Sequence, residues 1–116
     1  MVNTAGDIVC DTFVAYPKEK QQRPDPQWLG TGVKYNDIKP KFGAQEHAWV
    51  LAACRAILDK AGQVVGHALG NDENMLRGID FGKYAKFDTQ EFEEYKQYGK
   101  GSRPALRTLA AAVLGR

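Results

Sequence analysis

The sequence predicts an α/β fold with amphipathic helices. Residues 7–15 alternate as in a β-strand, and they are followed at 44–60 by apolar residues at helical spacing. The same order returns when Val64-Val65 lead through a small-residue turn into a second helical pattern. Strands that alternate with amphipathic helices are typical of α/β domains. The length of 116 residues and the apolar share of 43% predict one domain spanning residues 1–116.

The first predicted strand is Asp7–Ala15. Its side chains alternate between an apolar face and a mixed face. The apolar face carries Ile8, Cys10, Thr12 and Val14. Pro17 ends the strand, because proline has no N–H to donate to a strand ladder.

A basic segment follows the first strand. Residues 18–41 contain six basic and three acidic side chains, which is a net charge of +3. Pro24 and Pro26 exclude a regular core element across the first half of this segment. Two interpretations stay open, a solvated loop and a surface that contacts phosphates. The net charge of the whole chain, +2, is too small to indicate nucleic-acid binding by bulk electrostatics.

The first predicted helix is Ala44–Lys60. Its apolar positions recur every three or four residues and form one buried stripe. The stripe consists of His47, Val50, Leu51, Cys54, Ile57 and Leu58. His47 has no metal-binding partner one turn later, which favours a structural role. Cys10 and Cys54 lack the spacing of a zinc site and are interpreted as buried thiols in a reducing compartment.

The segment Gln63–Leu76 predicts a buried strand at Val64–His67, a tight turn and a helix start at Asn71-Asp72. Apolar residues then recur at helical spacing, at Met75, Leu76 and Ile79. Asp72 has two interpretations. A carboxylate is favoured at a helix start by the unpaired N–H groups there. The carboxyl end of a strand is also where ligands bind in open α/β sheets.

The last third of the chain predicts one short strand and two helices. Lys86–Thr89 is a strand end, and Asp88 or Thr89 is expected to cap a helix at Gln90–Gln97. Ser102 is expected to cap the last helix, with Pro104 in its first turn and Gly115 at its end. The buried stripe of that helix is Leu106, Leu109, Ala110 and Val113.

Three segments carry a resemblance to a known family: VGHALGND at 65–72, FDT at 87–89 and RPALRTLAAAVLG at 103–115. Together they resemble the DEDD-type (DEDDh) 3′–5′ exonucleases, in the eukaryotic RNA exonuclease branch. DIVCDTFVAYPKEK at 7–20 and TGVKYNDIKP at 31–40 extend the resemblance upstream. It implies a ribonuclease-H-like fold, an RNA or single-stranded nucleic-acid partner, and Mg²⁺ or Mn²⁺ as cofactor if the chain is active. It also implies a nuclear or nucleolar protein.

The resemblance assigns roles to particular residues. Asp72 matches the third metal-binding carboxylate of the family, which makes it the candidate catalytic residue and metal ligand. Thr31 and Gly32 match a segment beside the 3′ end of the substrate. His67 and Asn71, beside Asp72 in the chain, are the other candidate substrate-binding residues. Asp88 matches a residue that orders the backbone in the family and binds no metal.

The family's other catalytic groups have no counterpart between Met1 and Arg116. These groups are an Asp-x-Glu pair on the family's first strand, the family's last carboxylate and its general-base histidine. One carboxylate cannot hold a pair of magnesium ions, so we expect this chain alone to be inactive. Two explanations stay open: a piece of a full exonuclease, or a non-catalytic remnant that binds nucleic acid or protein. A small α/β domain that serves only association is a third.

The same resemblance predicts a truncated or rearranged sheet, because the family's central strand precedes the segment matched by Asp7–Ala15. Strand edges left without a partner pair with other chains, so we expect a homo-oligomer. No apolar run approaches the ~20 residues of a membrane span, and the first residues lack the pattern of a signal peptide. An intracellular protein that does not bind membranes is therefore expected.

Overall fold

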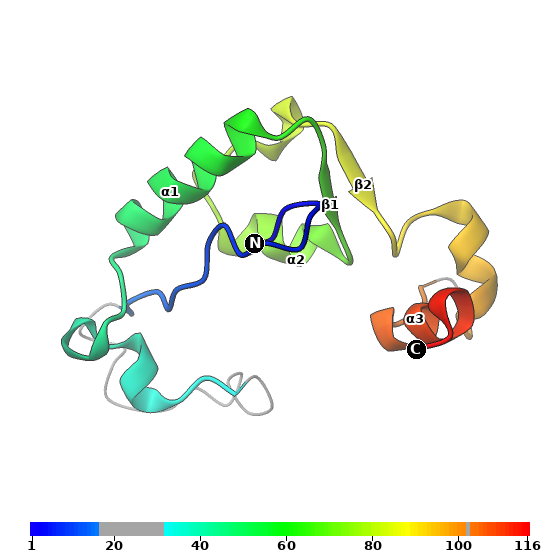
Figure 1. Ribbon diagram of the computed structural model, residues 1–116, viewed down its shortest axis with the longest axis horizontal. Helices are drawn as coiled ribbons and strands as arrows, with labels where there is room; N and C mark the ends of the chain where they lie inside the picture. The colour runs from blue at the N-terminus through cyan, green and yellow to red at the C-terminus, as the bar shows by residue number, and fades with distance from the viewer. Residues whose placement is uncertain (17–31, 102) are drawn as a thin grey trace. The chain divides into compact units, whose positions relative to one another are not determined.

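The computed structural model describes residues 1–16, 32–101 and 103–116 (Figure 1). The predictions for Pro17, the prolines of the basic segment, Thr31 and Ser102 lie outside the described residues. The chain divides into two compact units, Met1–Ile57 and Leu58–Arg116. Helices and a small parallel sheet make it an α/β chain.

The predicted strand Asp7–Ala15 is wrong. The structure has only isolated bridges there, an antiparallel one between Val2 and Ile8 and a parallel one between Val14 and Gln45. Within the described residues no second strand runs beside this segment, so its alternating pattern has no ladder to join. The side chain of Ile8 is consequently 69% exposed.

Two short 3₁₀ helices follow in the first unit, η3 at Tyr35–Ile38 and η4 at Pro40–Phe42. Ile38 is buried, and Ala44 joins it in the core just after η4. Gly43 closes η4 with a φ of 98°, a left-handed conformation that glycine adopts without strain.

The long helix α1 spans His47–Lys60, so it begins three residues later than the predicted Ala44. The predicted stripe is confirmed at Val50, Cys54 and Leu58, which are buried. His47 is exposed at the start of the helix, so placing it on that stripe was wrong. The i, i+4, i+8 spacing of the three buried positions puts them on one face of the helix.

The second unit contains a two-stranded parallel sheet, β1 at Val64–Gly66 and β2 at Lys86–Asp88 (Figure 1). Helix α2, at Leu69–Met75, begins just after β1. The register pairs Val65 with Phe87, as expected for a short strand at 86–89. The prediction that β1 is buried is wrong at its centre, since Val65 is 62% exposed.

Helix α2 is shorter than the helical spacing predicted. It ends at Met75, and Gly78 takes a positive φ of 104° before Ile79 is buried. Ile79 therefore reaches the core from the loop after α2, together with Phe81 of the 3₁₀ helix η5 at Phe81–Lys83.

The α-helix predicted at Gln90–Gln97 is instead the 3₁₀ helix η6 at Glu93–Tyr98. The N–H groups of Glu91 and Phe92 both donate to the backbone carbonyl of Asp88, so the chain turns before any helix begins. The ring of Phe92 then packs against Phe87 of β2 at a centroid distance of 5.0 Å.

The last helix, α3, spans Leu106–Leu114, and Gly115 ends it with a φ of 69° as predicted. Pro104 is buried but lies before the helix and not in its first turn, because Ala105 is the N-cap. The buried stripe predicted for this helix contains fewer buried residues than expected. Leu109 is buried, whereas Leu106 and Val113 are exposed. Among the described residues, no helix has the length and apolar character to span a membrane.

Candidate functional site

The turn between β1 and α2 is held by Asp88, the last residue of β2. Its two carboxylate oxygens accept the backbone N–H groups of Ala68 and Leu69, each at 2.9 Å. Gln90 donates a third backbone N–H at 2.9 Å. The expectation that Asp88 or Thr89 caps a helix at Gln90–Gln97 was wrong, because the next helix, η6, has Phe92 as its N-cap. The carboxylate of Asp88 instead caps the start of α2 from the neighbouring strand. Its backbone-ordering role agrees with the resemblance.

The backbone conformation of this turn requires hydrogen bonds of this kind to stabilise it. Ala68, the N-cap of α2, has a φ of 58° and a ψ of 47°, and it is the only described non-glycine residue with positive φ. The left-handed conformation costs roughly 1–2 kcal/mol for a residue with a Cβ. The hydrogen bonds that Asp88 accepts from Ala68 and Leu69 offset that cost.

The pKa of Asp88 reflects the same contacts. Burial by itself would raise the pKa of this carboxyl. The backbone N–H donors of Gln90, Leu69 and Ala68, with the nearby His67, outweigh burial and hold the pKa below its ordinary value. Asp88 is thus stabilised as a carboxylate.

A second set of contacts fixes His67. Its Nδ1 lies 2.9 Å from the hydroxyl oxygen of Thr89, and that hydroxyl donates to the backbone carbonyl of Gly66 at 3.1 Å. A hydroxyl has one proton to donate, so Nδ1 carries the proton in this pair. His67 and Thr89 therefore join the ends of β1 and β2.

Gly66 has a packing role in the turn. A Cβ built at this position would collide with the side chain of Leu69, which is buried. The first residue of α2 can approach the end of β1 only because Gly66 has no side chain. This contact brings α2 close to the carboxyl end of the strand.

Asp72 lies in the first turn of α2, and the residue is exposed. The turn just described therefore presents its carboxylate to solvent on the helix that follows β1. Asn71 is exposed beside it, and its backbone N–H donates to Ala68 at 3.1 Å. One residue along α2, Glu73 pairs with Lys86 of β2 at 2.7 Å, which ties the helix to the second strand.

The structure brings three of the predicted site residues, His67, Asn71 and Asp72, into one turn and helix start. Gly32 belongs to the other unit, where it is exposed with a φ of 81°. Thr31 lies outside the described residues.

The described residues do not form a site for a pair of magnesium ions. Among residues 1–16, 32–101 and 103–116, no group of three or more His, Cys, Asp or Glu side chains is placed to hold a metal. Two neighbouring dications need several oxygen ligands to balance their charge.

The sequence is similar to proteins named RNA exonuclease 4. It is 31% identical over 115 residues to the one from Homo sapiens, which covers 99% of this chain and 25% of that protein. It is 34% identical over 115 residues to the one from Mycosarcoma maydis, covering 99% and 28%. The similarity supports an exonuclease family.

The match to the protein from Xenopus tropicalis is of the same kind, 31% identical over 114 residues and covering 98% of this chain and 26% of the relative. The chain thus spans about a quarter of the length of the curated relatives it matches. No family model matches the chain. No solved structure matches it either.

Sequence reasoning missed the contact between Asp88 and the start of α2. The sequence did contain a signal for this contact. The backbone N–H groups at the start of the helix after one strand need acceptors, and Asp88 ends the neighbouring strand of the parallel pair. It also missed the pairing of Glu73 with Lys86, which depends on the register of the two strands.

Proposed function

We propose that this chain is a module of a two-metal 3′–5′ RNA exonuclease of the DEDD type, with a ribonuclease-H-like fold. The observation that carries the proposal is the match of almost the whole chain to RNA exonuclease 4 proteins, with Asp72 exposed on the helix that follows β1. The resemblance of residues 65–72 makes this aspartate one of the family's metal-binding carboxylates.

In this proposal the neighbours of Asp72 act on the substrate. The Nδ1 of His67 is bonded to Thr89, which leaves Nε2 to contact the substrate, and the exposed Asn71 offers an amide beside the carboxylate. Thr31 and Gly32 contact the 3′ end of the RNA, as their resemblance implies. A nuclear or nucleolar location belongs to the same proposal.

We further propose that residues 1–116 alone do not cleave RNA. Asp72 is the residue of this sequence that matches a metal-binding carboxylate of the family, and one carboxylate does not hold a magnesium pair. The remaining ligands would come from other sequence or from another chain.

An RNA-trimming assay tests this. The purified chain is incubated with Mg²⁺ or Mn²⁺ and a 5′-labelled unstructured RNA, and the product lengths are resolved on a gel. We expect no shortening, and no difference between the wild type and Asp72→Asn. Stepwise shortening from the 3′ end that Asp72→Asn removes, and Asp80→Asn leaves intact, would show that the chain holds the metal pair after all.

A second candidate function is nucleic-acid or protein binding without cleavage. Two features favour it. Three lysines lie along residues 34–41 of the first unit, and two of them, Lys34 and Lys41, are exposed. The N–H of Val64 and the carbonyl of Gly66 are bonded on the β2 side, so the N–H and carbonyl of Val65 face the outer edge of β1. Among the described residues no strand pairs with that edge.

We propose that the open edge of β1 supports a homo-oligomer by pairing with a second copy. Light scattering over a wide concentration range tests it. The expected result is a mass that rises with concentration and falls again in Val65→Lys, which places a charge on the edge. A constant monomer mass in the wild type would contradict oligomerisation.

A further inference from the structure

Residues 34–42 of the first unit present an exposed aromatic ring among lysines. The ring of Phe42 is 55% exposed, and the ammonium of Lys41 lies 5.7 Å from its centroid. Lys39 lies in the same turn, with its ammonium 3.8 Å from the centroid of the half-buried Tyr35 ring. An exposed ring with a cation beside it is a surface on which a nucleobase can stack.

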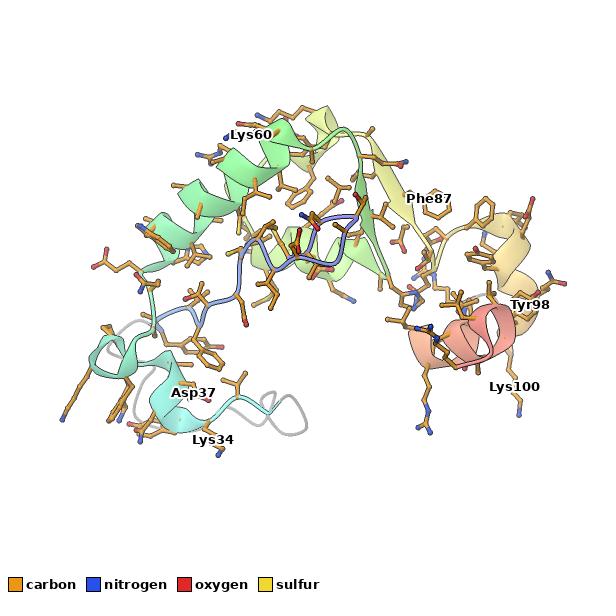
Figure 2. All side chains as sticks on the ribbon, in the orientation of Figure 1. Lys34, Asp37, Lys60, Phe87, Tyr98 and Lys100 are labelled. Atoms are coloured by element: carbon orange, nitrogen blue, oxygen red, sulfur yellow. The ribbon has the colours of Figure 1, made fainter. Side chains whose placement is uncertain are left out.

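The lysines of this segment are not neutralised by carboxylates of the described chain. Lys34 and Lys41 are exposed, and no described Asp or Glu forms an ion pair with either. The nearest acidic residue in sequence, Asp37, accepts the backbone N–H of Lys34 at 2.7 Å, which commits its carboxylate to the turn. Figure 2 shows the side chain of Lys34 projecting away from the ribbon.

Three of the five lysines in the second unit are paired with carboxylates. Lys83, Lys86 and Lys96 each lie within 3.1 Å of a carboxylate oxygen of their own unit. In residues 34–42, by contrast, the described structure pairs none of the three lysines with a carboxylate, and the ammonium of Lys41 lies beside the exposed ring of Phe42.

The backbone beneath the ring is ordered by local hydrogen bonds. Lys39 donates its N–H to Asn36, and Gly43 donates to Pro40, so that η3 and η4 form two consecutive turns joined at Lys39. The buried Ile38 anchors these turns to the core of the unit. A preformed surface loses less conformational freedom when a ligand binds.

We propose that residues 34–42 form a binding platform for single-stranded nucleic acid, which we call the Lys–Phe platform. Phe42 stacks on a base, and Lys34, Lys39 and Lys41 contact the flanking phosphates. Single strands fit this surface better than a duplex, whose bases are already stacked on one another. An acidic peptide would use the lysines but would leave the ring without a partner.

The Lys–Phe platform lies in the first unit and uses no residue proposed for catalysis. It relies on the proposed exonuclease function only for the choice of RNA as the probe. Binding and cleavage can therefore be measured separately.

The test is fluorescence anisotropy of a labelled eight-nucleotide oligouridylate titrated with the full chain at several salt concentrations. Three phosphate contacts on a single strand predict a slope of about −2 for the logarithm of affinity against the logarithm of salt concentration. Each of Lys34→Gln, Lys39→Gln and Lys41→Gln should reduce the magnitude of that slope by about 0.7. Lys100→Gln, which removes one exposed charge from the other unit, is the matched control.

The contribution of the ring is tested with two variants. Phe42→Leu keeps an apolar side chain and removes the π face, and it should weaken binding by about 5- to 150-fold. Phe42→Tyr keeps the π face and should bind like the wild type. Trp49→Leu alters an aromatic side chain that is equally exposed, at 56%, and should have no effect. Because Phe42 and Trp49 are both exposed, neither change removes a core contact.

Loss of affinity in Phe42→Leu with recovery in Phe42→Tyr would establish the platform. Equal affinities in Phe42→Leu and the wild type would overturn it. It would also be overturned if Lys100→Gln reduced the magnitude of the salt slope as much as Lys41→Gln does. A third contrary result would be that a polyglutamate peptide of matched charge displaces the oligouridylate from Phe42→Leu as effectively as from the wild type. None of these results decides the proposed exonuclease function, which depends on Asp72.

Discussion

The substitution Asp88→Ala tests whether the end of β2 holds the turn that leads to Asp72. It removes the acceptor of three backbone N–H groups, each 2.9 Å from a carboxylate oxygen. A hydrogen bond to a charged group contributes about 1.5–3 kcal/mol. Asp88 is half-buried, so water replaces part of each bond, and about 1 kcal/mol per donor is expected to be lost. The predicted loss is about 3 kcal/mol.

Asp88→Asn should cost about 1 kcal/mol, because one oxygen remains to accept from Ala68 and Gln90 while Leu69 loses its acceptor. Asp80→Ala is the matched control. Asp80 accepts a single exposed backbone N–H, that of Gly82 at 2.9 Å, so its loss should cost less than about 1 kcal/mol.

Urea unfolding followed by circular dichroism measures the stability, and amide hydrogen exchange at Ala68 and Leu69 measures the local opening of the turn. The reasoning would be refuted if Asp88→Ala were no less stable than Asp80→Ala and left exchange at both amides unchanged. Such a result would mean that the left-handed Ala68 is held by other contacts.

The depressed pKa of Asp88 gives this prediction a pH dependence. The unfolded carboxyl, with a pKa of about 3.9, binds a proton more readily than the folded one, whose pKa is lower. The stability from Asp88 is therefore fully present above the unfolded pKa and is lost as pH falls through the lower folded value. The difference between the wild type and Asp88→Ala should shrink over that acidic range.

Two further predictions concern Gly66 and Cys54. Gly66→Ala should lower the free energy of unfolding by about 1–3 kcal/mol in urea, because the new methyl group meets the buried Leu69; Gly70→Ala, with open space around it, should not. Burial, and then the contact with Cys10, raises the pKa of the Cys54 thiol. Iodoacetamide should therefore modify Cys10 before Cys54 at neutral pH, which mass spectrometry can measure. A loss of stability in Gly70→Ala would contradict the explanation for Gly66. Equal labelling rates of Cys10 and Cys54 would contradict the one for Cys54.

The elements that depend on local pattern could be predicted from the sequence. The buried positions Val50, Cys54 and Leu58 follow from helical spacing, and the order strand, turn and helix at 64–75 follows from apolar periodicity. The position of Asp72 in the first turn of α2 follows from that order. Each of these features is decided by residues close together in the chain.

The elements that depend on distant partners could not be predicted. The alternation at Asp7–Ala15 is that of a strand, but a strand needs a neighbouring ladder, and the described chain supplies only two isolated bridges. The triple role of Asp88 depends on the register that places it beside Ala68 and Leu69, some 20 residues away. Periodicity contains no information on such pairings.

The central claim is that Asp72 is a catalytic carboxylate of an RNA exonuclease module, and a chimera tests it most directly. The 115 residues of the Homo sapiens RNA exonuclease 4 that match this chain are replaced by the chain itself, and trimming of a 5′-labelled RNA is measured with Mg²⁺. Cooperative unfolding in urea first establishes that each variant is folded. The account predicts stepwise shortening from the 3′ end, abolished by Asp72→Asn and retained in Asp80→Asn. A folded chimera that trims RNA equally well with Asp72→Asn, or that does not trim at all, would contradict it.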